Sequence, residues 1–368
     1  MKVLHILSTT SASRGDLAVV MNYFRNIDRS KVTFDFATMF QYGDEVDEEI
    51  VSLGGKSFLF NKPSLRAPFK IISELRKIII DNAYDVVHLH LPTLHYFVKK
   101  AIKGTNIKLV IHSHSSRLSS KMLGRIRNRL LVTGVSCGAD ARFSCSMSSS
   151  KNLYGKSWGN KENDYLLKNA VDMKKFVYDP KLSKNLRKEL GVNDKIAFCH
   201  VGRFSEEKNH TRLIDIFNEI YKKEKNVHLF LIGDGPLKNS IQEKVNELGL
   251  QENVTFMGKR KDVSTLLKAM DVYLLPSLFE GLSVSLVEAQ ASGLLCFYSD
   301  SCSKESEITD NIYSISLKDD SESWAKFILD KYHEGWCRDV SEKVKQNGYD
   351  IEFESKKLLK KYKEIINA

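Results

Sequence analysis

The chain alternates short apolar runs, rich in β-branched residues, with longer stretches in which apolar residues recur at helical spacing. This alternation is typical of parallel sheets covered by helices. In the first half we expect helices such as 68–82 and 119–135 between successive strands. Those strands are predicted at 2–7, 32–37, 56–59, 85–89, 108–112, 141–146 and 165–167.

The pattern restarts at residue 195, after a charged segment at 179–194. A second series of strands is predicted at 195–201, 227–232, 254–257, 272–275, 296–298 and 312–315. Because 368 residues exceed one ordinary hydrophobic core, we predict an α/β chain of two Rossmann-like domains with parallel sheets facing an interdomain cleft. We place the first domain at 1–185 and the second at 186–349. The lysine-rich segment 350–368 has apolar residues at helical spacing, so we expect a terminal helix that packs on the first domain.

Composition narrows the class of protein. A hydrophobic fraction of 42% with 28% charged residues is ordinary for a soluble protein. No run approaches the ~18 apolar residues of a membrane span, and the run Val3–Leu7 is shorter than the ~7–15 of a secretory signal. The six cysteines show no C-x-x-C spacing and are expected to be free thiols. We therefore expect a cytoplasmic protein.

A formal net charge of +10 indicates an anionic partner. Nucleotide phosphates, an acidic membrane surface and nucleic acid are the candidates. Lysines are spread along the chain without an aromatic-basic motif, so nucleic acid is the least favoured of the three.

The loop after the predicted strand 272–275 carries the most informative chemistry. Glu280 lies on this loop, Gly281 permits a tight turn, and Ser283 can cap the next helix, whose free N–H groups would face a phosphate. Glu288 follows eight residues after Glu280, a little over two helical turns. Two carboxylates so placed can accept hydrogen bonds from vicinal hydroxyl groups. The alternative is a pair of solvated glutamates.

Three further loops follow strands of the same sheet, and the carboxyl ends of parallel strands meet at one edge. After strand 195–201 come Gly202, Arg203 and Lys208, a guanidinium and an ammonium that suit a diphosphate. The loop 232–236 contains Gly233, and the loop 257–262 contains Gly258 followed by Lys259. Each glycine would let the backbone approach a ligand. A basic loop alone is more often a solvated surface.

Taken together, these motifs resemble the donor-binding domain of the family-4 retaining glycosyltransferases, which have the GT-B architecture. The Glu-x7-Glu signature matches at Glu280 and Glu288, and V-G-R-F-x-x-x-K-N matches from Val201 to Asn209. The first half agrees more loosely, through Y-D-V-V-H-L-H and I-H-S-H-S. The resemblance covers nearly the whole chain and is strongest to bacterial members that build capsular and extracellular polysaccharides.

The resemblance implies roles for these residues. Arg203 and Lys208 would neutralise the donor diphosphate and stabilise the departing nucleotide. Glu280 would contact the donor sugar and Glu288 the ribose hydroxyls. The expected donor-binding residues are Gly15, Gly202, Arg203, Lys208, Gly233, Gly258, Lys259, Gly281, Leu282, Ser283 and Glu288.

A histidine after the strand 108–112 would line the sugar site, and counting from the strand favours His114 over His112. The expected catalytic residues are thus Glu280, His114, Arg203 and Lys208. Four histidines at two strand ends, His88 and His90 with His112 and His114, could also hold a metal. No carboxylate or thiol accompanies them at ligand spacing, and enzymes of this family need no metal. We therefore expect neither a metal nor a separate cofactor.

The implied activity is retaining transfer of a sugar from a nucleotide donor to a glycan or a polyprenyl-diphosphate-linked acceptor. Family habit favours a UDP-sugar over a GDP-sugar, and the positive charge would suit the anionic inner face of the cell membrane. One alternative is a UDP-sugar 2-epimerase, which releases UDP without an acceptor. A second alternative is a partner subunit that has kept the fold and lost turnover.

The loop after the first strand departs from the family pattern. Many relatives have a Gly-Gly pair there, and this chain has Arg14-Gly15-Asp16. As an adhesion motif the tripeptide would need an exposed extracellular loop, so we interpret it as an active-site loop. Ser283 and Leu295 stand where relatives often have proline, which leaves the donor and acceptor preference open.

Overall fold

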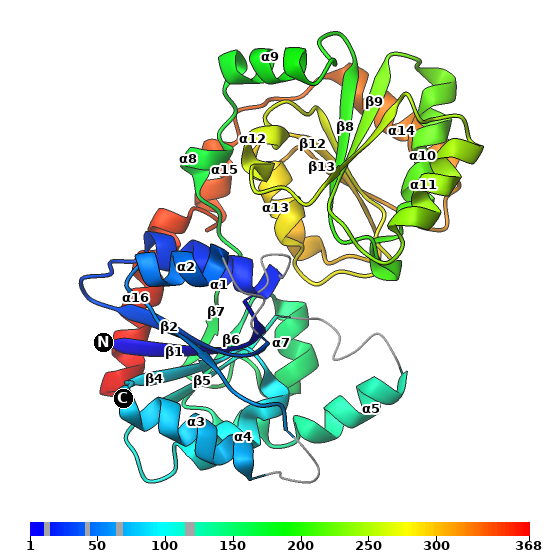
Figure 1. The fold of residues 1–368 in the computed structure, drawn as a ribbon. Helices are drawn as coiled ribbons and strands as arrows, with labels where there is room; N and C mark the ends of the chain where they lie inside the picture. Colours follow the sequence, from blue (N-terminus) through cyan, green and yellow to red (C-terminus); the bar gives the residue numbers. More distant parts are fainter. Residues whose placement is uncertain (11–14, 41–44, 64–68, 115–121) are drawn as a thin grey trace. The chain divides into compact units, whose positions relative to one another are not determined.

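The computed structural model describes residues 1–10, 15–40, 45–63, 69–114 and 122–368. The contacts divide the chain into two compact units, each with its own sheet (Figure 1). The first unit comprises Met1–Ala170 together with Ile351–Ala368, and the second is Val171–Asp350. Residues 171–185 therefore pack with the second unit, whereas the sequence interpretation had placed them with the first.

The first unit is built on a parallel seven-stranded sheet of order β3-β2-β1-β4-β5-β6-β7. Residues alternate between the two faces of each strand, so Leu4 and Ile6 lie on one face of β1 and His5 on the other. The strands are β1 Lys2–Thr9, β2 Thr33–Phe40, β3 Ser57–Leu59, β4 Val86–Leu89, β5 Lys108–Ser113, β6 Ala141–Ser144 and β7 Asp164–Leu166.

Helices cover both faces of this sheet. Apolar side chains of α3 and α4 pack with Leu4 and Ile6 in one core, while Phe24 of α1 and Tyr362 of α16 pack with Phe34 of β2 on the other face. The helical segments of this unit are α1 Gly15–Asn26, α2 Glu45–Ser52, α3 Lys70–Asp81, η1 Pro92–Leu94, α4 His95–Ala101, α5 Met122–Leu131, α6 Val135–Gly138, α7 Met147–Tyr154, η2 Gly155–Ser157 and α16 Ile351–Asn367.

Helix α16 comes from the end of the chain and completes the first unit. Its apolar positions Leu358, Tyr362 and Ile365 are buried. The hydroxyl of Ser355 donates to the carbonyl oxygen of Asn26 at 3.2 Å, which ties α16 to the end of α1. Helical spacing of the apolar residues thus supplies the buried stripe that holds the helix in place.

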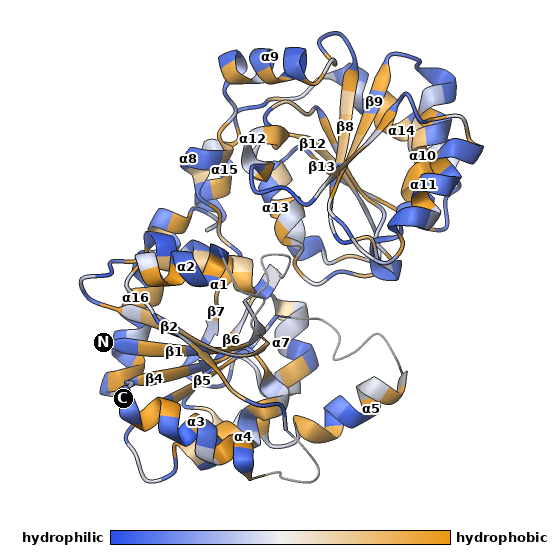
Figure 2. Cartoon of the chain, viewed as in Figure 1, coloured by the Kyte–Doolittle hydropathy of each residue, from blue (hydrophilic) through white to orange (hydrophobic). Residues whose placement is uncertain are grey.

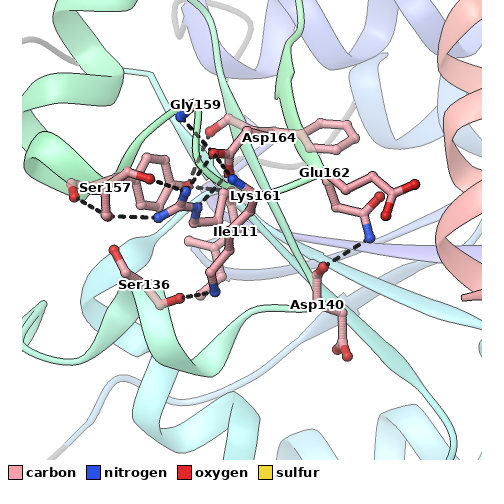
Figure 3. A network of polar contacts seen from close by, with 12 residues as sticks. Ile111, Ser136, Asp140, Ser157, Gly159, Lys161, Glu162 and Asp164 are labelled. Atoms are coloured by element: carbon pink, nitrogen blue, oxygen red, sulfur yellow. Dashed lines mark hydrogen bonds and ion pairs between the residues drawn. The ribbon is translucent and has the colours of Figure 1, made fainter.

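A buried ion pair links β6 to β7 (Figure 3). Arg142 is fully buried and donates to both carboxylate oxygens of Asp164, at 2.6 and 2.5 Å. The same guanidinium donates to the hydroxyl and carbonyl oxygens of Ser157, and the N–H groups of Gly159 and Lys161 donate to Asp164. Both charges are thus paired with each other and hydrogen-bonded to further partners, which a buried ion pair requires.

The second unit has a parallel six-stranded sheet of order β10-β9-β8-β11-β12-β13. The strands β9, β11 and β12 are almost entirely apolar and buried, as expected when helices cover both faces (Figure 2), whereas the edge strands β10 and β13 are largely half-buried. The strands are β8 Ile196–Val201, β9 Val227–Ile232, β10 Val254–Gly258, β11 Val272–Leu275, β12 Leu295–Ser299 and β13 Ile312–Ile315. The helical segments are α8 Met173–Phe176, α9 Pro180–Glu189, η3 Glu206–Lys208, α10 His210–Lys223, α11 Lys238–Glu247, α12 Val263–Leu267, α13 Val284–Ala291, η4 Lys304–Ser306, α14 Ser321–Glu334 and α15 Ser341–Gln346.

The charged segment at 179–194 forms helix α9, which begins with an Asp179 cap and Pro180. Arg187 anchors this helix to the second unit, since it donates to Asp271 at 2.8 Å and to the carbonyl oxygen of Lys195 at 2.6 Å. Arg187 is one of the charged residues on which the predicted domain boundary rests, and it attaches α9 to the second unit.

Among the described residues, no helix combines the length and the apolar character needed to cross a membrane. The six cysteines are free thiols, and Cys145, Cys199, Cys296 and Cys302 are buried.

Candidate active site

An ion pair joins the loops that follow β8 and β11. The ammonium of Lys208 lies 2.5 Å from Oε1 of Glu280, and the two side chains are only 15% and 17% exposed. The short segment η3 positions Lys208, and the backbone N–H of Leu278 donates to the carbonyl oxygen of Glu207 at 2.8 Å. The amide of Asn209 donates to the carbonyl oxygen of Pro276 at 3.1 Å. Two loops are thus held together around one cation and one anion that lie 72 residues apart in sequence.

Glu280 is oriented by small residues that the sequence interpretation did not single out. The hydroxyl of Ser277 donates to Oε1 of Glu280 at 3.5 Å. The backbone of Glu280 pairs with that of Cys302, which follows β12. Both residues lie in loops that follow strands of the same sheet, but nothing in the sequence pairs them with Glu280.

Two glycines allow the loops after β8 and β9 to pack against each other. A Cβ on Gly202 would lie 2.8 Å from Nε2 of His200 and 3.3 Å from Cε of Lys208. Gly233 has φ +141°, and its Cβ would lie 1.9 Å from the carbonyl oxygen of Gly202. The sequence predicts that Gly233 lets the backbone approach a ligand. In the structure, Gly233 lets its own loop approach the backbone of Gly202 in the neighbouring loop.

The loop after β10 joins the same edge of the sheet. Gly258 has φ +66°, and its carbonyl oxygen accepts from the N–H of Gly233 at 2.8 Å. The following residue, Lys259, is exposed. Arg203, in the loop after β8, is also exposed, and neither cation has an ionic partner in the part of the chain that the structure describes. Both are therefore available to an anionic ligand.

Ser283 occupies the N-cap position of α13, but its side chain does not cap the helix. Its hydroxyl lies 3.2 Å from that of Ser285, which in turn accepts from the hydroxyl of Tyr273 at 2.8 Å. The expectation of a side-chain cap is therefore wrong. The first N–H groups of α13 lack that cap, and Gly281 and Leu282 lead the backbone to them.

Glu288 lies on α13 and is half-buried. Its carboxyl group makes no hydrogen bond or ion pair with any residue that the structure describes. Burial raises the pKa of Glu288 to about 7. The chain thus keeps on α13 a carboxyl group without a partner among the described residues, which suits ligand hydroxyl groups.

The first unit contains a row of five histidines on one face of its sheet. His5 comes from β1, His88 and His90 from β4 and the residue after its end, and His112 and His114 from β5 and the residue after its end. Neighbouring rings stack or tilt against each other with centroids 3.9 to 5.3 Å apart. Register between parallel strands builds this row, because residues of one face lie side by side across the sheet.

The two candidate histidines differ in burial. His112 is fully buried, whereas His114 is half-buried where β5 ends. Burial lowers the pKa of His112 well below its ordinary value, and the same holds for His88 and His90. Of the two, His114 is the one that a ligand can reach.

Two groups of three histidines have ligand nitrogens within 4.8 Å of one another. These groups are His5, His88 and His90, and His90, His112 and His114. Neither includes a carboxylate or a thiol among the described residues. The expectation that the enzyme works without a metal stays a prediction.

Gly15 is the first residue of α1, the helix that follows β1 in the chain, and it is exposed. Its contact with a donor stays a prediction. Asp16 accepts a hydrogen bond from the N–H of Leu17 at 3.0 Å. Arg14 lies outside the described residues.

Comparison with known proteins shows the family of the chain. The family model described as "Glycosyl transferases group 1" matches residues 183–350, and "Glycosyltransferase Family 4" matches residues 18–174. The chain is 32% identical over 359 residues to EpsF of Bacillus subtilis (strain 168), which is named as a glycosyltransferase; the match covers 95% of this chain and 93% of EpsF. The chain belongs to the group 1 glycosyltransferases.

Other relatives of this glycosyltransferase carry more specific names. The capsular polysaccharide biosynthesis glycosyltransferase CapH of Staphylococcus aureus is 26% identical, with 78% of each chain covered. An Escherichia coli enzyme named UDP-Gal:alpha-D-GlcNAc-diphosphoundecaprenol alpha-1,3-galactosyltransferase is 27% identical over 64% of this chain and 63% of its own.

Solved structures confirm the predicted fold of the glycosyltransferase. HepE of Anabaena, in complex with UDP and glucose, superposes with a TM-score of 0.80 at 17% identity and covers 99% of this chain and 100% of its own. Sucrose-phosphate synthase of Thermosynechococcus elongatus superposes with a TM-score of 0.79 at 14% identity, covering 100% of this chain and 99% of its own. The two Rossmann-like units are those of the GT-B fold.

Proposed function

We propose that this glycosyltransferase moves a sugar from a UDP-sugar to a glycan or lipid-linked oligosaccharide during polysaccharide biosynthesis. The observation that carries the proposal is the Lys208–Glu280 ion pair, together with the exposed Arg203 in the loop that leads from β8 to Lys208. A diphosphate competes with Glu280 for the ammonium of Lys208, and this frees the carboxylate to accept hydrogen bonds from sugar hydroxyls. The names of EpsF, CapH and the E. coli enzyme support the activity and its setting.

The remaining donor contacts follow from the same sheet edge. Lys259 adds positive charge near Gly258, and the uncapped N–H groups after Leu282 and Ser283 suit a phosphate oxygen. Glu288 accepts hydrogen bonds from the ribose hydroxyls. As the bond to the sugar breaks, Arg203 and Lys208 stabilise the charge that develops on the leaving diphosphate.

We propose that transfer retains the anomeric configuration and needs no metal, as the family resemblance implies. On this account the leaving phosphate takes the proton of the acceptor hydroxyl from the same face of the sugar. We also propose for His114 the catalytic role that the family resemblance implies. A carboxylate nucleophile is not required by this chemistry.

We further propose that the enzyme works in the cytoplasm, against the inner face of the cell membrane. Helix α5 supports this, since Leu123, Ile126 and Leu130 are 82%, 54% and 72% exposed (Figure 2). The helix carries no acidic residue, and the exposed Arg127 and Arg129 lie among these apolar side chains. Exposed leucines beside arginines suit a surface of anionic lipid. A lipid-linked acceptor would be reached at that surface.

The two alternatives to glycosyl transfer can be distinguished by whether UDP release depends on an acceptor. A UDP-sugar 2-epimerase would release UDP from the donor alone, and the family match does not favour it. A partner subunit without turnover would bind the donor and transfer nothing. We expect release of UDP that depends on an acceptor.

A panel of nucleotides and nucleotide sugars, screened for thermal stabilisation, tests the donor assignment. A ligand that binds only the folded state raises the unfolding temperature. We expect UDP and one UDP-sugar to stabilise the wild type and to have little effect on Lys208→Ala. Stabilisation by GDP-sugars alone would contradict the donor assignment, and equal stabilisation of both proteins would contradict the site.

A further inference from the structure

His200 is fully buried near the end of β8, two residues before the loop that leads to Lys208 opens with Gly202. Its Nδ1 lies 2.7 Å from the carbonyl oxygen of Leu274 on the neighbouring strand β11. A carbonyl oxygen can only accept a hydrogen bond, so Nδ1 of His200 carries a proton. This hydrogen bond ties β8 to β11.

The charge state of His200 determines what its second ring nitrogen can do. Burial lowers the pKa of His200 well below its ordinary value, and the neighbouring His210 and Lys208 lower it further. The ring is therefore neutral and carries a single proton, the one on Nδ1. Nε2 is thus a bare acceptor, and it is buried without a hydrogen-bond partner among the described residues.

The missing side chain of Gly202 leaves a space that borders both Nε2 of His200 and the side chain of Lys208. A Cβ placed in this space would lie 2.8 Å from Nε2, and 3.3 and 3.4 Å from Cε and Cδ of Lys208. The ammonium follows directly after Cε and pairs with Glu280 at 2.5 Å. A rotation about the last bonds of the Lys208 side chain would therefore bring the ammonium toward Nε2.

We propose that His200 is a positioning residue, which accepts a hydrogen bond from the Lys208 ammonium once the donor diphosphate has replaced Glu280. An ammonium has three N–H groups. Phosphate oxygens can then accept from two of them while Nε2 holds the third, which directs the positive charge at the leaving group. A neutral acceptor suits this role, because it brings no negative charge that would compete with the diphosphate. The inference rests on the proposed role of Lys208 in donor binding and extends it to a buried residue.

The hydrogen bond can be detected by NMR on protein labelled with ¹⁵N in histidine, because a bare ring nitrogen that accepts a hydrogen bond shifts toward the protonated range. We expect Nε2 of His200, identified by its loss in His200→Asn, to move in this direction when the wild type is saturated with UDP. Uridine, which lacks the diphosphate, should leave the resonance where it lies in the free protein.

Two substitutions separate the roles of the two ring nitrogens. The amide of His200→Asn can still donate to the carbonyl oxygen of Leu274, but it has no atom at the position of Nε2. We expect it to lower kcat roughly tenfold, with KM for the donor within about twofold of wild type and an unchanged urea midpoint. The longer side chain of His200→Gln can place its amide oxygen near the position of Nε2 and gives up the bond to Leu274. This variant should keep most of kcat and lower the urea midpoint.

His210→Phe is the matched control for His200→Asn. His210 is almost as deeply buried as His200, and the two rings meet edge-on with centroids 4.7 Å apart. Neither nitrogen of His210 has a hydrogen-bond partner among the described residues, so the substitution removes none. A phenyl ring can keep the stacking on Phe204, whose centroid lies 4.1 Å away. We therefore expect kcat of His210→Phe to stay close to that of wild type.

The identity of the donor to Nε2 is tested by a double-mutant cycle. In a Lys208→Ala background, His200→Asn should cost no further activity, because the ammonium it would hold is gone. An equal loss in both backgrounds would overturn the proposal, and so would a larger loss of kcat in His200→Gln or in His210→Phe than in His200→Asn.

The NMR result separates this inference from the proposed function. A UDP complex in which the Nε2 resonance of His200 has not moved overturns the role of His200 and leaves the donor assignment intact. If UDP does not bind the wild type at all, both the inference and the proposed function fail.

Discussion

The ammonium of Lys208 lies 2.5 Å from the carboxylate of Glu280, and neither side chain is more than 17% exposed. A bound diphosphate would form an ion pair with the ammonium of Lys208 in place of Glu280. Lys208→Ala removes that charge from the leaving group, so we expect kcat/KM for the donor to fall by roughly 100- to 1,000-fold. Initial rates of UDP release in the presence of acceptor measure this.

Lys222→Ala is the matched control for Lys208→Ala. Lys222 also pairs with a glutamate, Glu219 at 2.6 Å, but its side chain is 59% exposed on α10. Its removal should change kcat/KM by less than about twofold. Equal effects of the two substitutions would mean that Lys208 acts through stability alone.

Gly233 is predicted to be intolerant of any side chain. A Cβ would lie 1.9 Å from the carbonyl oxygen of Gly202, and φ is +141°. We expect Gly233→Ala to lower the free energy of unfolding by roughly 2–4 kcal/mol, measured in urea. Gly249→Ala is the control, because Gly249 also has positive φ but its Cβ would meet nothing within 4 Å. That variant should lose only about 1 kcal/mol.

Glu288 is expected to make stability depend on pH. Burial raises its pKa from 4.5 to about 7, so the folded state holds this proton more tightly than the unfolded state. The contribution is fully present below pH 4.5 and is lost as the pH rises through about 7. Above pH 7, Glu288→Gln should therefore be more stable than wild type by about 1–2 kcal/mol, a figure reduced for partial exposure. A wild-type-like pH profile for Glu288→Gln would contradict this.

The same group should link nucleotide binding to pH. On the proposed role of Glu288, ribose hydroxyls would donate to its carboxylate form, so UDP should bind wild type more tightly at pH 8 than at pH 6. Titration of UDP itself also changes the affinity with pH. Calorimetry on both wild type and Glu288→Gln separates that effect from the effect of Glu288. The variant should bind more weakly at pH 8, and the wild-type protein should show the steeper gain with pH.

Asp164 should be necessary for the stability of the first unit. Burial raises its pKa, but the hydrogen bonds from Arg142 and from the N–H groups of Gly159 and Lys161 outweigh burial, and the pKa is lowered overall. Asp164→Asn leaves the fully buried guanidinium without a counter-charge, so we expect a loss of about 3–5 kcal/mol in urea unfolding. The double variant Arg142→Met with Asp164→Leu should recover much of that loss. A single variant as stable as wild type would contradict the assignment.

Helix α5 should bind anionic vesicles. Leu130 is 72% exposed, and Leu130→Glu adds a negative charge to an apolar and basic surface. We expect co-sedimentation with phosphatidylglycerol vesicles to fall at least about fivefold. Val51→Glu is the control, since Val51 is 64% exposed on α2. Equal loss in both variants, or wild-type binding that ignores lipid charge, would rule out this surface.

Hydrophobic periodicity was sufficient to predict both sheets, because strands covered on both faces are continuous apolar runs. The predicted strand 227–232 coincides with β9, and the predicted 272–275 with β11. The charged loop residues could also be placed from the sequence, since they follow strands whose carboxyl ends share an edge. Which residues touch within that edge could not be predicted, and Ser277 and Cys302 were missed for this reason.

Hydrogen-bond partners on different strands cannot be predicted from a single sequence. The hydrogen bonds between His5 and His90 and between His90 and His114 depend on the register of three strands, and the partner of Arg142 lies 22 residues away. The cap expected from Ser283 does not form, and the Ser283 hydroxyl lies 3.2 Å from that of Ser285 instead. Local patterns identify residue types, whereas tertiary contacts decide between hydrogen-bond partners.

Helix α16 gives the chain an unusual order of assembly during synthesis. The first unit needs residues 351–367 for its buried stripe, but the whole second unit is translated before them. Val171–Asp350 can therefore finish folding while the sheet that begins at Lys2 still lacks its last helix. The unit that is translated first is therefore completed last. The hydrogen bond between Nδ1 of His88 and the hydroxyl of Tyr362, 2.6 Å long, can form only after the end of the chain has been made.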